Sequence, residues 1–461
     1  MSFTQALSGL RSQGENIAIV SNNIANSQTV GFKNSRPSFA DIFAGSSRVG
    51  LGTRVAAVMQ DFRAGDFDNT GRTLDAAIVG QGFYRLEYPN GEQVVYSRNG
   101  MFNVNEDGFL INPNGQFLTG YGLNDPADPF SALNVGAAPE RLQIPQQDMP
   151  ANATENVITT YNLDSTAISL GDPNADTETF RYDINIDDPD ADPEFYNLEF
   201  HYSNSFTTYD SLGNQRTVTT YYTKVGDNTW EARVMMDGRR PDWGAGATDE
   251  NDADFTLNFD QNGRLQEEDG TIIGTGVVVE GGVAEDGPDE LEAMGRFQIN
   301  FGEVFEDDED FDGAAPLVFS MDLNGTTQFN NTSAQKTMNQ DGYTAGILMG
   351  LEILDDGRVM RNYSNEERRA AGQIVLANFV NPEGLQPDGD NGWRQSIASG
   401  EPLLGEAGTG SFGTIMSETL ESSNVDLAQE LVNMIVAQRA YQANSSSIST
   451  QDELLQTVIN L

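Results

Sequence analysis

The sequence predicts a multidomain protein whose terminal α-helices pair as a coiled coil and whose middle is mainly β. Three observations predict this class. Both ends carry apolar residues at alternating three- and four-residue steps, the spacing of an amphipathic helix. Between them, polar and apolar residues alternate and Asn-Gly and Asp-Gly pairs recur, a pattern typical of β-hairpins. A length of 461 residues exceeds one core, so several domains are expected.

The N-terminal segment, residues 1–32, is predicted to be a helix followed by a turn. Its apolar seam consists of Leu7, Leu10, Ile17 and Ile24. Asn23, Asn26 and Gly31 end the pattern, because asparagine and glycine favour turns over helix interiors. Residues 33–75 contain short apolar pieces separated by glycine and polar residues, and we expect an extended linker there.

The middle of the chain is predicted to form two β-domains, one inserted in the other. Residues 76–162 carry hairpin signals at Asn90-Gly91, Asn99-Gly100, Asp107-Gly108 and Asn114-Gly115. Residues 163–333 form a second, strongly acidic β-region, and residues 334–399 return to the pattern of the first. We therefore expect an outer β-domain inserted in a middle one, followed by a Gly-rich linker over residues 400–422.

The C-terminal segment, residues 423–461, is predicted to be one long helix. Ser423 is expected to cap its start, with Asp426 in the first turn. The apolar seam consists of Leu427, Leu431, Met434, Tyr441, Ile448, Leu455 and Ile459. Such a stripe also fits the core-facing side of an ordinary globular helix. Its place at the end of the chain, and the polar residues that interrupt it, favour pairing with another helix.

Charge excludes some classes of partner. The chain has 25 Lys and Arg against 70 Asp and Glu, a net charge of −45, so nucleic acid and anionic membranes would repel it. It has no cysteine, and no stretch is apolar enough to span a membrane. The first residues lack the basic and apolar regions of a secretory signal, so we expect no cleaved signal peptide.

No motif predicts an enzyme, a metal site or a cofactor. His201 is the one histidine, which rules out two-histidine zinc motifs. Asp308, Asp310 and Asp312 match only the first half of a calcium loop, and prolines interrupt Asp188, Asp190 and Asp192. Gly408, Gly410 and Gly413 match a dinucleotide motif without its βαβ context. A calcium-dependent adhesin or carbohydrate-binding protein, and an acidic hydrolase using a carboxylate pair, remain as alternatives.

Several short motifs resemble those of the bacterial flagellar rod and hook axial proteins. The N-terminal ones are SNNIAN (21–26) and TVGFK (29–33), and the C-terminal one is SNVDL (423–427). Between them, LDAAI (74–78), GQGF (80–83) and YSRNG (96–100) are similar to the start of the family's shared β-domain. YDSLGN (209–214) and NYSNE (362–366) look like hook rather than rod sequence. A distal-rod subunit remains the alternative within the family.

The resemblance implies a structural role. Hook proteins polymerise into a curved, flexible tube that acts as a universal joint between motor and filament, with the helices innermost around an export channel. It further implies contacts with rod, hook-cap and hook–filament junction proteins, export by the flagellar apparatus, and a place in the hook–basal body outside the cell. The seam residues named above, with Asn23, Asn26, Gly31 and Phe32, would form the assembly interface.

Overall fold

The computed structural model describes residues 3–42, 50–91, 93–183, 195–238, 253–265, 267–268, 271–272, 296–301, 313–315 and 317–459. The chain divides into two compact units. Unit 1 comprises Met1–Gln147 and Leu348–Leu461, and unit 2 comprises Asp148–Ile347. Both ends of the chain therefore belong to unit 1, and the middle of the sequence forms unit 2.

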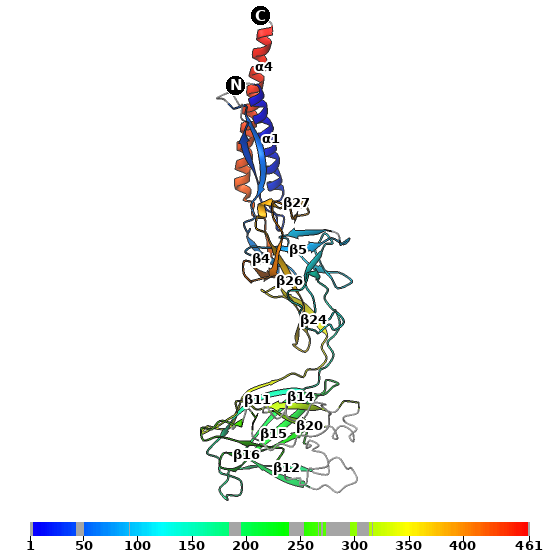
Figure 1. The fold of residues 1–461 in the computed structure, drawn as a ribbon, viewed down its shortest axis with the longest axis vertical. Coiled ribbons are helices and arrows are strands. Elements are labelled where there is room, and N and C mark those ends of the chain that lie inside the picture. The colour runs from blue at the N-terminus through cyan, green and yellow to red at the C-terminus, as the bar shows by residue number, and fades with distance from the viewer. Residues whose placement is uncertain are drawn as a thin grey trace. The chain divides into compact units, whose positions relative to one another are not determined.

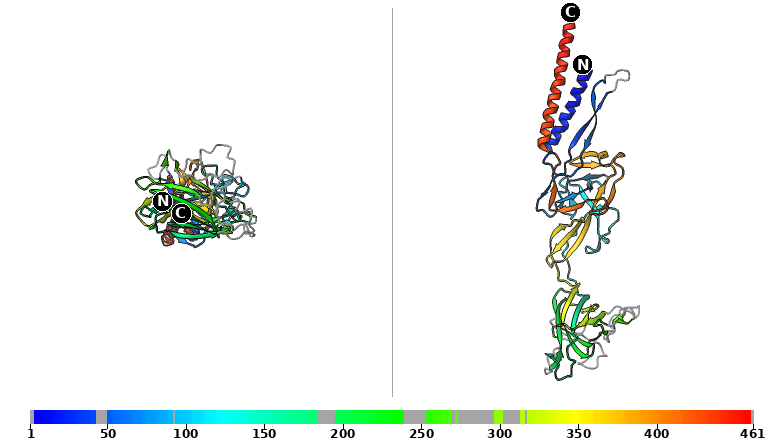
Figure 2. Two further views of the ribbon diagram at one scale, coloured as in Figure 1. Left: turned by 90° about the horizontal axis from the view of Figure 1, so that it is seen from below. Right: turned by 90° about the vertical axis from the view of Figure 1, so that its left-hand side faces the viewer.

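Two helices and a hairpin lie side by side at one end of unit 1 (Figures 1 and 2). They are α1 (Phe3–Ala25), α4 (Leu427–Ile459), β1 (Ser35–Asp41) and β2 (Thr53–Gln60). Strands β1 and β2 pair antiparallel, and the Ser12 hydroxyl joins α1 to the hairpin by donating to Thr53 O at 3.0 Å. The terminal helices of the predicted fold class are present, and the structure places a paired hairpin within residues 33–75, for which we expected an extended linker.

The start of α4 differs from the predicted cap. Asp426 Oδ1 accepts the backbone N–H groups of Ala428 at 2.9 Å and Gln429 at 3.1 Å, so Asp426 caps the helix. Ser423, the expected cap, instead accepts the N–H of Val425 at 3.3 Å, before the helix begins. The prediction was wrong by three residues because both side chains can cap a helix and spacing alone does not choose between them.

The rest of unit 1 is a β-module. Its strands before unit 2 are β3 (Phe67–Asn69), β4 (Ala76–Val79), β5 (Phe83–Glu87), β6 (Val94–Ser97), β7 (Asn103–Val104), β8 (Leu110–Ile111), β9 (Phe117–Tyr121) and β10 (Glu140–Arg141). Those after it are β24 (Leu348–Ile353), β25 (Arg358–Tyr363), β26 (Arg368–Asn378), β27 (Gln386–Gly389), β28 (Gly392–Arg394), β29 (Leu403–Glu406), β30 (Thr414–Ser417) and β31 (Thr419–Glu421), with a 3₁₀ turn η2 (Pro382–Gly384). The two sets interleave in one sheet of order β24-β25-β26-β9-β5-β6-β28-β27.

Strand pairing explains how the β-module closes. Strand β30 pairs with β4, and β31 pairs with β3, so residues 400–422, expected to be a linker, supply strands instead. The core contains Ile78, Leu86, Leu118, Ile374 and Leu376, each fully buried and drawn from strands on both sides of unit 2 in the sequence. Neither half of the β-module could bury these side chains without the other.

Three of the four predicted hairpin turns of this region are confirmed. Gly91 separates β5 from β6, Gly108 separates β7 from β8, and Gly115 separates β8 from β9, each with positive φ. Gly100 is different, because an added Cβ there would lie 1.6 Å from Ala76 O. That glycine serves close backbone packing between neighbouring segments.

Unit 2 is built from strands alone in the residues described. They are β11 (Asn156–Asp164), β12 (Glu178–Asp183), β13 (Phe195–Phe200), β14 (Tyr202–Tyr209), β15 (Gln215–Gly226), β16 (Thr229–Met236), β17 (Phe255–Asn258), β18 (Glu267–Glu268), β19 (Thr271–Ile272), β20 (Arg296–Asn300), β21 (Val318–Asp322), β22 (Thr327–Phe329) and β23 (Ala334–Gln340). One sheet has the order β20-β21-β11-β22, with β23 on β11, and another has the order β14-β15-β16-β17.

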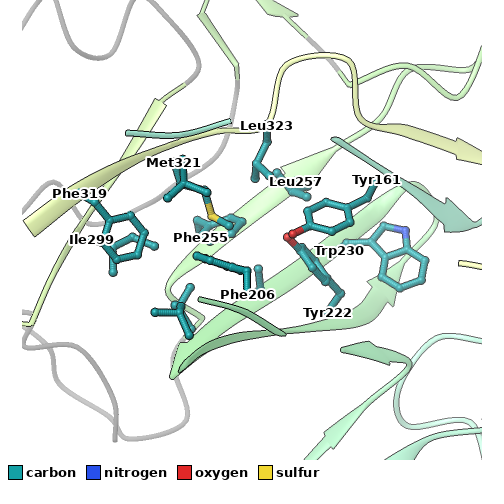
Figure 3. Packing of buried hydrophobic residues seen from close by; sticks show 14 of the residues in the cluster. Tyr161, Phe206, Tyr222, Trp230, Phe255, Leu257, Ile299, Phe319, Met321 and Leu323 are labelled. Atoms are coloured by element: carbon teal, nitrogen blue, oxygen red, sulfur yellow. The ribbon is translucent and has the colours of Figure 1, made fainter. Parts of the chain in front are cut away.

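One hydrophobic core joins these two sheets. Tyr161 from β11 and Met321 from β21 pack with Tyr222, Trp230 and Phe255 from the other sheet (Figure 3). The alternating burial of β16 and β21 follows from their alternating sequences, since successive side chains of a strand point to opposite faces. The mainly β character expected for the middle of the chain is therefore confirmed.

Candidate assembly interface

Helix α1 packs against α4 with the two helices running in opposite directions. Near the end of α1, Asn23 Nδ2 donates to Glu430 Oε2 at 3.3 Å. Near its start, a Cβ added to Gly9 would lie 2.9 Å from Asn444 Nδ2. The same number of residues separates the two contacts on each helix, as the common rise per residue requires. Small and polar side chains therefore form these two contacts between the helices.

Asn23 joins three parts of unit 1 and is only 1% exposed. Its Nδ2 donates to Asn34 Oδ1 at 2.9 Å and to Ser35 O at 2.8 Å, besides the contact with Glu430. Its Oδ1 accepts the N–H of Ser35 at 3.1 Å. The backbone N–H of Asn34 in turn donates to Asn424 Oδ1 at 2.8 Å. One asparagine thus fixes α1, the start of β1 and the start of α4 together.

A buried carboxylate, Glu421, forms the centre of the junction between the helices and the β-module. Its Oε1 lies 2.5 Å from Lys33 Nζ, and both side chains are completely buried. Its Oε2 lies 3.3 Å from Arg98 Nη1. Oε1 also accepts the N–H of Gly65 at 3.0 Å, and Lys33 Nζ donates to Arg63 O at 2.8 Å. One acidic side chain therefore pairs with two buried cations from distant parts of the sequence.

Burial affects the ionisation of both cations. It lowers the pKa of the Lys33 ammonium, while the neighbouring Glu421 carboxylate opposes that shift. It also lowers the pKa of the Arg98 guanidinium, again against the attraction of Glu421. Without the carboxylate, each cation would carry an uncompensated desolvation cost. Glu421 is thus the group on which the charge balance of the junction depends.

Gly31 brings the turn after α1 directly onto the β-module. Its N–H donates to Glu421 O at 2.8 Å, and its φ is +70°. An added Cβ would lie 2.7 Å from Asn99 N and 2.8 Å from the Arg98 carbonyl carbon. Both the positive φ and the close backbone contact therefore require glycine at this position.

Gly31→Ala is expected to destabilise unit 1 more than Gly71→Ala. Gly71 has nearly the same φ, +67°, but an added Cβ there meets nothing within 4 Å. Gly71→Ala, the control, should lower the free energy of unfolding by about 1–2 kcal/mol through backbone strain alone. Gly31→Ala should cost about 1–3 kcal/mol more because of the clash. Thermal unfolding followed by helical circular dichroism measures both, and equal losses would contradict the close contact.

The side of α4 that faces away from α1 carries exposed apolar side chains. They are Leu427, Leu431, Val432, Ile435 and Val436, between 46% and 62% exposed, and we call them the α4 stripe. At 3.6 residues per turn Leu431, Val432, Ile435 and Val436 lie away from Glu430, Ala437 and Asn444, the side chains on the α1 side, and Leu427 lies at the edge between the two sides. Exposed apolar surface of this kind marks an interaction site.

The predicted interface residues fall into three groups in the structure. Asn23 and Gly31 are buried, and Leu7, Leu10, Ile17, Ile24, Asn26, Phe32, Met434 and Ile448 are partly buried. Leu427, Leu431, Tyr441 and Leu455 are exposed, and the side chain of Ile459 lies outside the described residues. The structure brings Asn23 and Gly31 into one junction, and it leaves the start of the α4 seam exposed.

Sequence reasoning missed the charged centre of the junction. Lys33 and Arg98 stand within motifs that the sequence analysis noted, but Glu421 stands just before the C-terminal motif and drew no attention. A usable signal is rarity, because only 25 residues of this chain are Lys or Arg and these two stand in short turn motifs. Their partner, more than 320 residues away from either, could not be chosen among 70 acidic residues.

His201 has a structural place in unit 2. Its Nε2 lies 2.7 Å from Ile168 O, and its Nδ1 accepts the backbone N–H of Lys224 at 3.1 Å. Both ring nitrogens therefore bind backbone groups, and His201 lies between β13 and β14 rather than within the predicted strand. Neither nitrogen is left to serve a metal or a substrate.

The other candidate motifs give no site. Gly408 and Gly410 have positive φ, and the N–H of Gly408 donates to Gly413 O at 2.9 Å, so the glycine run forms the turn between β29 and β30. The acidic runs 188–192 and 308–312 lie outside the described residues. Among the residues that are described, no group of three or more acidic or histidine side chains is placed to hold a metal ion, and no helix is long and apolar enough to cross a membrane.

Family models match consecutive segments of the chain. Residues 4–33 match the flagella basal body rod protein, and residues 77–161 match the D1 domain of the flagellar hook protein FlgE/F/G. Residues 162–343 match the D2 domain of the flagellar basal body protein FlaE, and residues 416–461 match the C-terminal domain of the rod FlgEFG proteins.

Whole-chain relatives decide the family. The flagellar hook protein FlgE of Salmonella typhimurium is 41% identical, and that of Escherichia coli is 40% identical, each over 100% of both chains. The chain belongs to the flagellar hook protein family. The hook-family protein FlgE of Borreliella burgdorferi is 32% identical over 100% of this chain and 99% of its own. Such relatives are structural proteins of the flagellum, and the prediction of a flagellar hook protein is confirmed.

A solved structure of a hook-family protein is also similar. The crystal structure of the Helicobacter pylori flagellar hook protein FlgE2 matches with a TM-score of 0.48 and 16% identity, over 77% of this chain and 100% of that one. The assignment to the hook family rests on the sequence identities.

Proposed function

We propose that this hook-family chain polymerises, copy upon copy, into the curved and flexible tube of the flagellar hook. In that role it acts as a universal joint between the rod and motor on one side and the filament on the other. Two observations support the proposal. The chain is similar to hook proteins over its full length, and a single copy leaves the α4 stripe exposed. The stripe is the observation that most directly supports polymerisation, because contact with neighbouring copies would remove its apolar surface from water.

The finer architecture is proposed on the same basis. The antiparallel contact of α1 with α4 supports pairing of the terminal helices as a coiled coil, and the division into two units supports an outer domain inserted in a middle one. The predicted domain ranges are retained: 1–32, 33–75, 76–162, 163–333, 334–399, 400–422 and 423–461. The D1 and D2 family-model matches lie near three of these boundaries and support them.

The proposed partners and location follow from the family. The chain would contact rod, hook-cap and hook–filament junction proteins, and the flagellar export apparatus would carry it outside the cell without a cleaved signal peptide. The predicted interface residues are proposed to act in two ways. Asn23 and Gly31 hold the subunit together, whereas Leu427 and Leu431 meet neighbouring copies.

Electron microscopy of basal bodies from cells that lack this chain tests the proposal. Complete rods without hooks, restored by the wild-type chain, are expected. Missing rods would assign the chain to the distal rod, and intact curved hooks would overturn the proposal.

A further inference from the structure

The end of α4 extends past α1 and has no helix beside it (Figure 1). Because Gly9 lies beside Asn444 and α1 begins at Phe3, the residues of α4 after about 451 pass beyond the start of α1. Leu454 and Leu455 are 61% and 56% exposed there. Asp452 and Glu453 precede them, and no Lys or Arg follows Arg439 in the sequence. This overhang, residues 452–459, is both apolar and acidic.

A groove in unit 1 has the complementary character. It has a volume of about 690 Å³, within the usual range of binding sites, and lies between the hairpin and the β-module. Its lining includes Met59, Phe62, Phe83 and Val380 as apolar side chains, Arg36, Arg63 and Arg98 as basic ones, and Asp61 and Glu383 as acidic ones. Met59 and Val380 are 45% and 94% exposed. The arginines outnumber the carboxylates in this lining, so an apolar ligand with negative charge would suit it.

The charge of the groove is unusual for this chain. Arg63 pairs with Asp61 at 2.5 Å, whereas among the described residues Arg36 makes no ion pair. In a protein of net charge −45, most surfaces repel a second copy. A groove whose lining has three arginines against two carboxylates is one place where an acidic segment of the same chain can approach favourably.

The overhang of one copy cannot reach its own groove. The groove lies at the hairpin base, where Asn23 contacts Glu430, and Leu455 is 25 residues further along α4. At about 1.5 Å per residue that separation is roughly 37 Å. Any contact between overhang and groove must therefore join two copies. A contact between unlike surfaces of identical subunits also repeats along a helical polymer.

We propose that the overhang of α4 in one copy docks in this groove of a second copy, with Leu454 and Leu455 against its apolar lining and Glu453 near Arg36. This inference rests on the proposed polymerisation and names a contact within it. It makes the end of α4 a longitudinal connector between successive subunits.

Disulfide trapping tests the contact, since the chain has no cysteine of its own. Hooks from cells producing Leu455→Cys/Met59→Cys are isolated and oxidised. A ladder of covalent multimers is expected, because only an intermolecular contact brings these positions within the roughly 7 Å that a disulfide allows. The matched control is Leu455→Cys/Met349→Cys, since Met349 is 72% exposed and outside the groove, and no ladder is expected from it.

The outcomes separate this inference from the proposed function. Hooks that form normally and give no ladder from the 455/59 pair, or equal ladders from both pairs, would overturn the docking while leaving the hook assignment intact. Absence of hooks from the cysteine-free parent would instead overturn the assignment.

Charge reversal gives a second measurement that does not depend on cysteine. Arg36→Glu is expected to reduce the number of hooks per cell severely, and Arg36→Glu/Glu453→Lys to restore it at least partly. Thermal unfolding of the purified subunits checks that each variant folds. A folded Arg36→Glu subunit that assembles normally, or a double variant without any recovery, would contradict the pairing.

Discussion

Glu421→Gln is expected to lower the free energy of unfolding of unit 1 by about 3–5 kcal/mol, the cost of removing one partner from a buried ion pair. The carboxylate is fully buried and serves both Lys33 and Arg98. Glutamine keeps the size of the side chain but leaves two buried cations without a counter-charge. Denaturant unfolding followed by helical circular dichroism measures the loss, because both helices described, α1 and α4, belong to unit 1.

Two further variants make this prediction specific. Glu383→Gln removes the same charge from an exposed position of unit 1 and should change stability by no more than about 0.5 kcal/mol. Lys33→Met should cost less than Glu421→Gln, since Arg98 still neutralises the carboxylate. A loss below about 1 kcal/mol for Glu421→Gln, or the reverse order of the two junction variants, would show that the charges are compensated in another way.

Val436→Asp is expected to abolish assembly while leaving the free subunit stable. Val436 is 62% exposed in the α4 stripe, so aspartate there meets water in a single copy and should change the free energy of unfolding by about 0.5 kcal/mol or less. In the polymer the same side chain would be buried, and an unpaired buried carboxylate costs several kcal/mol in every subunit. Counting hooks by electron microscopy, with motility assays, measures the loss.

Gln442→Asp is the matched control for the stripe. It adds the same charge to an exposed position of the same helix, at a residue that is already polar. Hooks should form with Gln442→Asp and be absent with Val436→Asp. If Val436→Asp subunits assembled as well as the control, the stripe would not be an assembly surface.

The sequence predicted the helices well because their apolar spacing extends over many turns. It predicted the seam less well. A strict seven-residue repeat drifts by about 20° per heptad on a straight α-helix. Over the two heptads from Leu427 to Tyr441 the seam therefore turns by about 40°, from the edge of the α1 side toward α1, and Tyr441 lies 3.9 Å from a Cβ added to Gly14. Apolar periodicity identifies a helix, but it does not identify which partner each side meets.

The junction was harder to predict than the β-strands. Alternation and Asn-Gly or Asp-Gly pairs are local signals, and they correctly located three of the turns among β5 to β9. Glu421, Lys33 and Arg98 become neighbours only in the folded protein. In the sequence, each of them looks like an ordinary charged residue exposed to solvent. The strands within 400–422 were missed for a similar reason, since β30 and β31 are short and their partners β4 and β3 are more than 300 residues away.

The distance in sequence between Lys33 and Glu421, 388 residues, also sets the order in which the subunit can fold. The chain is synthesised from its N-terminus, so Lys33 is present early and its counter-charge, Glu421, is added almost last. Until then the ammonium can remain hydrated only if the surrounding segment stays open, because burying it alone is costly. Closing so long a loop is also slow. The early part of the chain is therefore kept from completing its structure before its last residues are present, which would suit the export route proposed above.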